Sequence, residues 1–166
     1  MYSHGGDSAG GNLAAVVAQQ TKFDQDSPML QLLWVPWVDM STERSSYDLF
    51  GDGFFLDRSQ ARWYIDHYIN NESNKVDPLA SPLFGDVSDV APAVILVAGF
   101  DVLRDEGIEY AQKLKDAGVD TELKIYETLP HPFMNMAGEI DDARVAFSEA
   151  AKILKERLSD GRKAMK

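Results

Sequence analysis

Residues 93–98 (AVILVA) constrain the fold most strongly, because six apolar residues follow one another without polar alternation. Residues 29–38 (MLQLLWVPWV) have a similar character and are rich in Leu, Val and Trp. Apolar runs of this kind are typical of parallel strands that are covered on both faces of the sheet. The sequence therefore predicts a buried strand in each segment, the earlier one ending near Pro36.

The segments around these strands alternate between helical and extended patterns. Helical spacing of apolar residues, small apolar composition and helix-end signals predict helices over residues 10–22, 61–69 (after a capping box at Asp57 and Gln60), 104–117 and 140–158. Extended segments are predicted at residues 1–4 and 121–126, and surface segments at residues 39–55 and 70–91. This alternation favours the α/β class, with a mainly parallel sheet of about four strands and helices on both faces.

The charge balance restricts the kinds of partner that the chain can bind. A formal net charge of -11 at pH 7 argues against nucleic acid and anionic membranes, because phosphate groups are bound by clustered Lys and Arg. The chain contains no Cys, which excludes a disulfide framework and a thiolate metal site. No apolar run reaches the roughly 18 residues of a membrane-spanning helix.

With 166 residues, the chain is long enough for one domain with a sizeable core. The residues after Met1 are polar and Gly-rich, unlike a secretory signal peptide. We therefore expect a cytoplasmic location by default, an expectation that is open if the natural chain is longer at its N-terminus.

A short glycine-rich stretch near the N-terminus matches a pattern with chemical meaning. Gly6, Ser8 and Gly10 form G-x-S-x-G, the pattern of a serine held on a sharp turn between a strand and a helix. Small residues on both sides let the hydroxyl project and let a substrate approach closely. The apolar residues 12–18 follow at once and predict a buried helix behind the serine. The alternative is a Gly-rich helix entry without chemistry.

Three candidate residues follow predicted strands. In open parallel sheets, functional sites lie beyond the carboxyl ends of the strands, where Ser8, Asp101 and His131 are expected to meet. A serine hydroxyl needs a neighbouring base, usually histidine, and a carboxylate that orients the imidazole. The order Ser, Asp, His along the chain is the order found in α/β-hydrolases.

Each candidate also has an ordinary structural interpretation. His131 could be an inert loop histidine, and Asp101 could cap the next helix. His4 and His67 are poorer candidates for the base, since one precedes the glycine-rich turn and the other lies in the middle of a helix. We interpret Asp105 and Glu106 as favourable charges in the first turn of a helix.

The sequence contains no signature of a metal or cofactor site. It has no phosphate-binding loop, no HExxH and no EF-hand loop, so we expect neither a metal nor a cofactor. Acidic pairs are interpreted as solvated surface, and the aromatic residues as packing groups. Pocket-lining roles are left open for Trp37 and Phe133. The acidic pairs are Asp24 with Asp26 and Asp141 with Asp142, and the aromatic residues are Trp34, Trp37, Trp63 and Tyr64.

Four stretches together resemble the hormone-sensitive-lipase-like family of bacterial carboxylesterases: GDSAGGNLA at 6–14, SPL at 81–83, GFDVLRDEG at 99–107 and HPFMNM at 131–136. The resemblance implies that residues 1–158 form the C-terminal catalytic half of an α/β-hydrolase domain, with a frayed polar tail at 159–166. It also implies Ser8 as nucleophile, Asp101 as orienting acid, His131 as base and the Ala9 N–H as an oxyanion donor. The implied reaction is hydrolysis of a small-molecule carboxylic ester, usually with a shorter acyl chain, through an acyl-enzyme and without a cofactor.

The chain departs from this family in two places. Family members usually have Gly after the catalytic histidine, whereas Pro132 biases His131 toward extended geometry. The family also carries an HGGG-type oxyanion loop and a cap upstream of the glycine-rich turn at residues 6–10, which we call the elbow. The chain resembles only strands five to eight of the family's eight-stranded sheet. Losing one oxyanion donor costs about 10²–10³ in rate, so weak activity or none is expected of the chain alone.

These departures predict an unpaired sheet edge at the elbow strand, and exposed edges recruit other chains. We expect a homo-oligomer, or association with a missing N-terminal half. The alternative function is a non-catalytic, truncated hydrolase scaffold that binds a ligand or a partner. A peptidase or amidase on the same fold is a third possibility, which GDSAGG disfavours.

Overall fold

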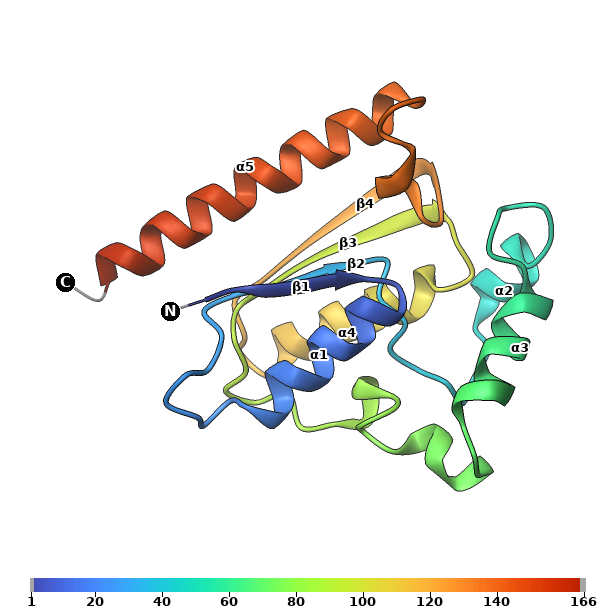
Figure 1. Ribbon diagram of the computed structural model, residues 1–166, viewed down its shortest axis with the longest axis horizontal. Helices are drawn as coiled ribbons and strands as arrows, with labels where there is room; N and C mark the ends of the chain where they lie inside the picture. The colour runs from blue at the N-terminus through green and yellow to red at the C-terminus, as the bar shows by residue number, and fades with distance from the viewer. Residues whose placement is uncertain (1, 165–166) are drawn as a thin grey trace.

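The computed structural model describes residues 2–164 and contains a parallel sheet with helices on both faces (Figure 1). The sheet has four strands in the order β1-β2-β3-β4, and every neighbouring pair is parallel. The strands are β1 (His4–Asp7), β2 (Gln31–Trp34), β3 (Ala93–Phe100) and β4 (Thr121–Pro130). The predicted α/β class and the predicted strand number are therefore confirmed.

The helices divide between the two faces of the sheet and its carboxyl edge. The α-helices are α1 (Ala9–Gln20), α2 (Ser45–Phe50), α3 (Arg58–Tyr68), α4 (Arg104–Asp116) and α5 (Asp141–Ala164). Short 3-10 turns lie at η1 (Glu72–Val76), η2 (Pro82–Phe84) and η3 (Phe133–Met136). Figure 1 shows α1 and α4 on one face, α5 on the other, and α2 and α3 beyond the carboxyl ends of the strands.

Strand β3 explains how one apolar run supplies two cores. Successive side chains of a strand point to opposite faces of the sheet. Ala93, Ile95 and Val97 pack in the core with α1 and α4. The alternate residues 94, 96 and 98 pack in the second core, under α5. Because both faces are covered, the strand has no polar alternation, as its sequence predicts.

Several element boundaries differ from the sequence-based prediction. Strand β1 runs into the elbow through Asp7, whereas an extended stub was predicted at residues 1–4. Strand β2 ends at Trp34 because Val35 takes a positive φ of 38°, so the strand is shorter than residues 29–38. Helix α2 and the 3-10 turns η1 and η2 were missed within the predicted surface segments.

The end of the chain is helical further than expected. Helix α5 continues to Ala164, so residues 159–164 belong to it, while the rest of the predicted tail lies outside the described residues. At the start of α3, the predicted capping box is confirmed. There the Asp57 N–H donates to Gln60 Oε1 at 3.0 Å.

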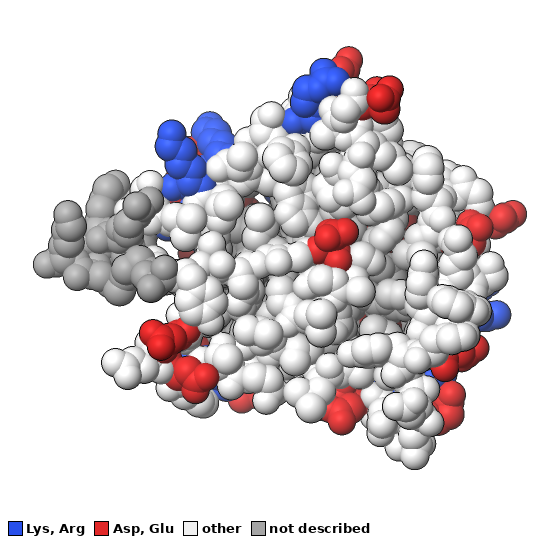
Figure 2. Space-filling view, viewed as in Figure 1, with Lys and Arg blue, Asp and Glu red and all other residues white. Residues whose placement is uncertain are grey.

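One face of the molecule is apolar and ends in a free strand edge. Within residues 2–164, β1 pairs only with β2. Beside β1, helix α1 exposes 56% of Leu13 and 41% of Val17. Figure 2 shows that most of this face is uncharged, apart from an acidic group near its centre, and that both acidic and basic side chains lie at its margin. The face therefore offers apolar side chains next to unpaired backbone groups.

The core on the α4 side provides a test of packing. Leu114 on α4 is completely buried, so its replacement by Ala removes apolar contacts and leaves a cavity. We expect Leu114→Ala to lower the free energy of unfolding by about 2–5 kcal/mol. The neighbouring exposed Lys115→Ala is the control, expected within about 0.5 kcal/mol of the parent. Urea denaturation followed by circular dichroism gives both values, and equal losses contradict the core assignment.

Candidate active site

Ser8 occupies the turn between β1 and α1 in a backbone conformation that is uncommon for a residue with a side chain. Its φ is 52° and its ψ is -115°. Such a conformation costs of the order of 1–3 kcal/mol and persists only where the surroundings enforce it. The Ser8 hydroxyl makes no capping hydrogen bond to α1, so it remains available to the pocket.

Three backbone hydrogen bonds hold the Ser8 turn in place. The Ser8 N–H donates to the Trp34 carbonyl at 2.9 Å. The Ser8 carbonyl accepts from the N–H groups of Asn12, at 3.0 Å, and Trp37, at 3.2 Å. Trp34 is the last residue of β2 and Trp37 lies three residues further on, so the end of β2 and the segment after it bind the N–H and the carbonyl of Ser8.

The two glycines of the motif have different roles. A Cβ at Gly6 would lie 2.3 Å from the carbonyl carbon and oxygen of Gly10, so the turn requires glycine at position 6. A Cβ at Gly10 would meet only Asp7 Oδ1, at 3.9 Å. Close packing therefore explains the first glycine, whereas a Cβ at position 10 would meet no steric obstacle.

Asp101 and His131 come together although they lie thirty residues apart in the sequence. His131 Nδ1 is 2.8 Å from Asp101 Oδ2, and both side chains are buried. The second oxygen, Asp101 Oδ1, accepts the N–H of Leu103 at 2.9 Å, which fixes the carboxylate. The His131–Pro132 peptide bond is cis, and Pro132 does not prevent the imidazole from reaching the carboxylate.

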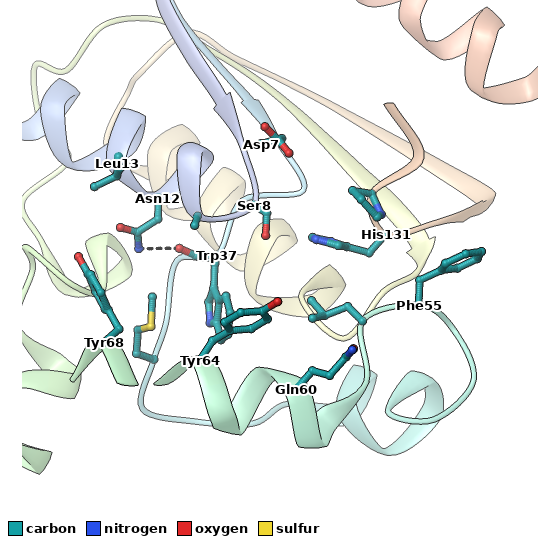
Figure 3. Close-up of a pocket in the computed structure, with 14 residues that line it drawn as sticks. Asp7, Ser8, Asn12, Leu13, Trp37, Phe55, Gln60, Tyr64, Tyr68 and His131 are labelled. Atoms are coloured by element: carbon teal, nitrogen blue, oxygen red, sulfur yellow. Dashed lines mark hydrogen bonds between the residues drawn. The ribbon is translucent and has the colours of Figure 1, made fainter. Parts of the chain in front are cut away.

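Ser8 and His131 line the same cavity, whose volume is about 700 Å³. Figure 3 shows the Ser8 hydroxyl and the His131 ring facing one another at its mouth. The two side chains are not hydrogen-bonded to each other, and such bonds commonly tighten only when substrate is bound. The remaining wall is mostly apolar and includes Leu13, Trp37, Met40, Phe55, Leu56, Tyr64 and Tyr68.

Ala9 lies at the start of α1 and lines the same cavity. The N–H groups of a first helical turn have no acceptor within the helix. The Ala9 N–H is therefore free of helical bonding and directly follows the serine, the position at which α/β-hydrolases have an oxyanion donor.

The other two histidines lie outside this cavity. His67 on α3 places Nδ1 2.8 Å from the carbonyl of Trp63, at the surface. Burial of the His4 ring lowers the pKa of that side chain, and a backbone hydrogen bond at Ala14 offsets this only in part. Both positions agree with the sequence-based ranking of the bases.

Of the two aromatic residues left open, Trp37 lines the cavity and Phe133 does not. Phe133 is buried under α5, with ring centroids 5.7 Å from Trp34 and 5.2 Å from Tyr126. Tyr64, which was interpreted as a packing residue, also lines the cavity.

Asn12 was missed by the sequence reasoning. Its side-chain amide donates to the carbonyls of Trp37 and Ala80, both at 2.7 Å, and so joins α1 to two loops; Figure 3 draws the bond to Trp37. The available signal was a polar residue at the start of an otherwise small and apolar helix.

The described part of the chain contains neither a cluster of metal ligands nor a membrane-spanning helix. Among its residues, no three His, Cys, Asp or Glu side chains are grouped so that they could hold a metal ion. No described helix has both the length and the apolar character needed to cross a bilayer.

Comparisons with known proteins agree with this geometry. A family model described as the alpha/beta hydrolase fold matches residues 4–135. The chain is 38% identical over 162 residues to the carboxylic ester hydrolase LipN of Mycobacterium tuberculosis, covering 93% of this chain and 43% of that protein. It is 35% identical over 156 residues to the ethyl acetate hydrolase of Pseudomonas putida, covering 92% and 49%.

The solved structures give the same result. The thermostable carboxylesterase EstE1, cloned from a metagenomic library, matches with a TM-score of 0.90 and 32% identity, covering 94% of this chain and 54% of that one. The fold is thus a partial α/β-hydrolase fold. The chain belongs to the hormone-sensitive-lipase-like carboxylesterase family, and it spans about half the length of the relatives it matches.

The packing of the Ser8 turn can be tested with matched glycine substitutions. Gly6→Ala forces the elbow apart, and we expect it to lower stability by about 1–3 kcal/mol. Gly138→Ala places its Cβ in open space and serves as the control, with a change of at most about 0.5 kcal/mol. Thermal unfolding of the two variants measures the difference. A Gly6→Ala protein as stable as the control would show that the turn is not packed as described.

Proposed function

We propose that this chain carries the Ser-His-Asp centre of a carboxylic ester hydrolase that works through an acyl-enzyme. The main support is the 2.8 Å contact between Asp101 and His131, in a buried setting, with the ring facing the Ser8 hydroxyl in one cavity. Membership of a carboxylesterase family supports the choice of esters as substrates. In this proposal residues 1–158 form the catalytic half of the domain.

The three side chains have distinct roles in the proposed reaction. Asp101 holds the proton of His131 on Nδ1, which leaves Nε2 as the base. Nε2 takes the hydroxyl proton while Ser8 Oγ adds to the ester carbonyl carbon. The tetrahedral intermediate then expels the alcohol, which receives the proton from His131, and the acyl group stays on Ser8.

Water completes the cycle. His131 takes a proton from a water molecule, whose oxygen adds to the acyl carbon. The second tetrahedral intermediate then releases the carboxylic acid, and His131 returns its proton to Ser8 Oγ. In both intermediates the Ala9 N–H is the oxyanion donor that we assign in this chain.

The apolar cavity wall suits neutral esters with short acyl chains. The side chains of Leu13, Trp37, Met40 and Tyr64 contribute apolar surface, and no Lys or Arg is among the lining residues. An acyl group can be buried against this surface without loss of hydrogen bonds. We therefore choose p-nitrophenyl acetate and butyrate as probes.

We expect slow hydrolysis of both probes by the chain, and labelling of Ser8 by a fluorophosphonate. Ser8→Ala removes the nucleophile and should abolish the labelling and lower kcat/KM by at least about 10³-fold. Ser148→Ala, on the surface of α5, is the matched control and should behave as the parent. Labelling that persists in Ser8→Ala contradicts the proposal. A parent that neither hydrolyses the esters nor reacts with the fluorophosphonate favours the non-catalytic scaffold.

We also propose that the apolar face beside β1 is covered in the active protein. Strand β1 has a free edge within the described residues, and α1 exposes Leu13 and Val17 next to it. The relatives are about twice as long as the region they share with this chain. The expected partner is a second copy of the chain or an N-terminal hydrolase half, which would also supply further oxyanion donors.

The association state can be measured directly. Size-exclusion chromatography with light scattering should give a mass above the 18.5 kDa of one chain for the purified protein, or for its mixture with an N-terminal half of a family member. The double variant Leu13→Asp/Val17→Asp places charges on the apolar face and should reduce the association. A compact monomer under both conditions rules out the proposed contact.

A further inference from the structure

Glu106 is a buried carboxyl group with no role in the chemistry proposed above. It lies in the first turn of α4, where the sequence predicted a favourable charge at a helix N-terminus, and its side chain is completely buried. Oε1 accepts the N–H groups of Val38 at 2.7 Å and Asp39 at 3.1 Å. Oε2 is buried and has no hydrogen-bond partner among the described residues.

Burial of such a group is costly, so the surrounding structure must compensate for it. Desolvation raises the pKa of the Glu106 carboxyl well above its usual range, and the two backbone bonds counteract this only in part. Arg44 favours the charged form and Asp39 opposes it, and these two residues form their own ion pair at 2.7 Å. The contacts that fix the position of Glu106 are therefore its hydrogen bonds to the backbone.

The backbone groups that Glu106 binds directly follow Trp37, which is hydrogen-bonded to the Ser8 turn. Trp37, directly before Val38, donates its N–H to the Ser8 carbonyl at 3.2 Å. The Trp37 carbonyl accepts from Asn12 at 2.7 Å. Glu106 thus binds the residue next to Trp37, which contacts the serine turn directly.

Helix α4 also begins directly after the loop that contains Asp101, the residue that contacts His131. Asp101 precedes α4, and its Oδ1 accepts the N–H of Leu103, the N-cap residue of that helix. Helix α4 is therefore linked to Ser8 through Glu106 and to His131 through Asp101. A helix linked to both residues through these hydrogen bonds restrains the distance between them.

We propose that Glu106 is a positioning residue for ester hydrolysis, which fixes residues 37–39 and thereby holds the Ser8 turn in register with Asp101 and His131. This inference rests on the proposed function. Misplacement of a reacting group by about 1 Å can cost of the order of 10²-fold in rate, so loss of the two acceptor bonds should be visible in kcat.

Substitutions of similar size separate positioning from stability. Glu106→Gln keeps an oxygen that can accept the same two N–H groups, and its kcat should stay within about 3-fold of the parent. Glu106→Leu keeps the volume but removes the acceptor, and its kcat should fall about 10²-fold with little change in KM.

Gln19→Leu is the matched control. Gln19 is also buried and donates to Pro82 O at 2.8 Å and Tyr110 Oη at 3.1 Å, but it lies at the far end of α1 from Ser8. This variant should lose stability and keep its kcat. A Glu106→Leu protein that folds and retains its kcat, or a Glu106→Gln protein that loses as much as Glu106→Leu, overturns the proposal.

Amide hydrogen exchange gives a readout that does not depend on activity. In Glu106→Leu, the N–H groups of Trp37, Val38 and Asp39 should exchange at least about 10-fold faster, while Glu106→Gln keeps them protected. If the parent neither hydrolyses esters nor reacts with fluorophosphonate, the proposed function fails, and the exchange at Trp37 still decides whether Glu106 holds the Ser8 turn. Unchanged protection of Trp37 refutes that link.

If Glu106→Leu does not fold, Glu106→Asp replaces it. The shorter side chain withdraws the acceptor from the Val38 and Asp39 N–H groups and keeps the acid. We expect faster exchange at these positions and at least about a 10-fold loss of kcat relative to Glu106→Gln. Equal kcat values and equal exchange in the two variants contradict the proposal.

Discussion

The conformation of Ser8 is the constraint on which the rest of the site depends. A positive φ of 52° is unfavourable for serine, so it must be enforced by neighbouring groups. The close approach of α1 to Gly6 and the two backbone bonds from Trp34 and Trp37 supply this enforcement. Because Trp34 ends β2 and Trp37 follows it, this support of the Ser8 turn depends on the pairing of β1 with β2.

The parallel sheet brings the other two members of the site to the same edge. Asp101 and His131 each follow a strand, and the carboxyl ends of neighbouring parallel strands lie side by side. Burial then strengthens the contact between them, since little water competes for the carboxylate. Helix α3 and the segment before it, which lie beyond this edge, close the cavity with side chains such as Leu56 and Tyr64.

The exposed face beside β1 contrasts with the well-covered remainder of the sheet. Strands β2 and β3 are paired on both sides and packed on both faces, whereas β1 and β4, the outer strands, each have one edge unpaired among the described residues, and the apolar side chains of α1 lie beside the edge of β1. Unpaired strand edges and exposed apolar side chains are features that other chains bind. The chain thus holds Ser8, Asp101 and His131 in place while leaving the boundary beside β1 open within the described residues.

Local sequence patterns were sufficient for the four strands, for the four longer helices and for the candidate residues Ser8, Asp101 and His131. The apolar run at 93–98, the G-x-S-x-G turn and the order of Ser8, Asp101 and His131 are visible without coordinates, because strand burial and turn geometry depend on neighbouring residues. Only the tertiary structure decided that Asp101 and His131 are in contact, that Val35 ends β2 early, and that Glu106 is buried against Val38. These features arise from packing between segments far apart in the chain, and local propensity carries no information about such contacts.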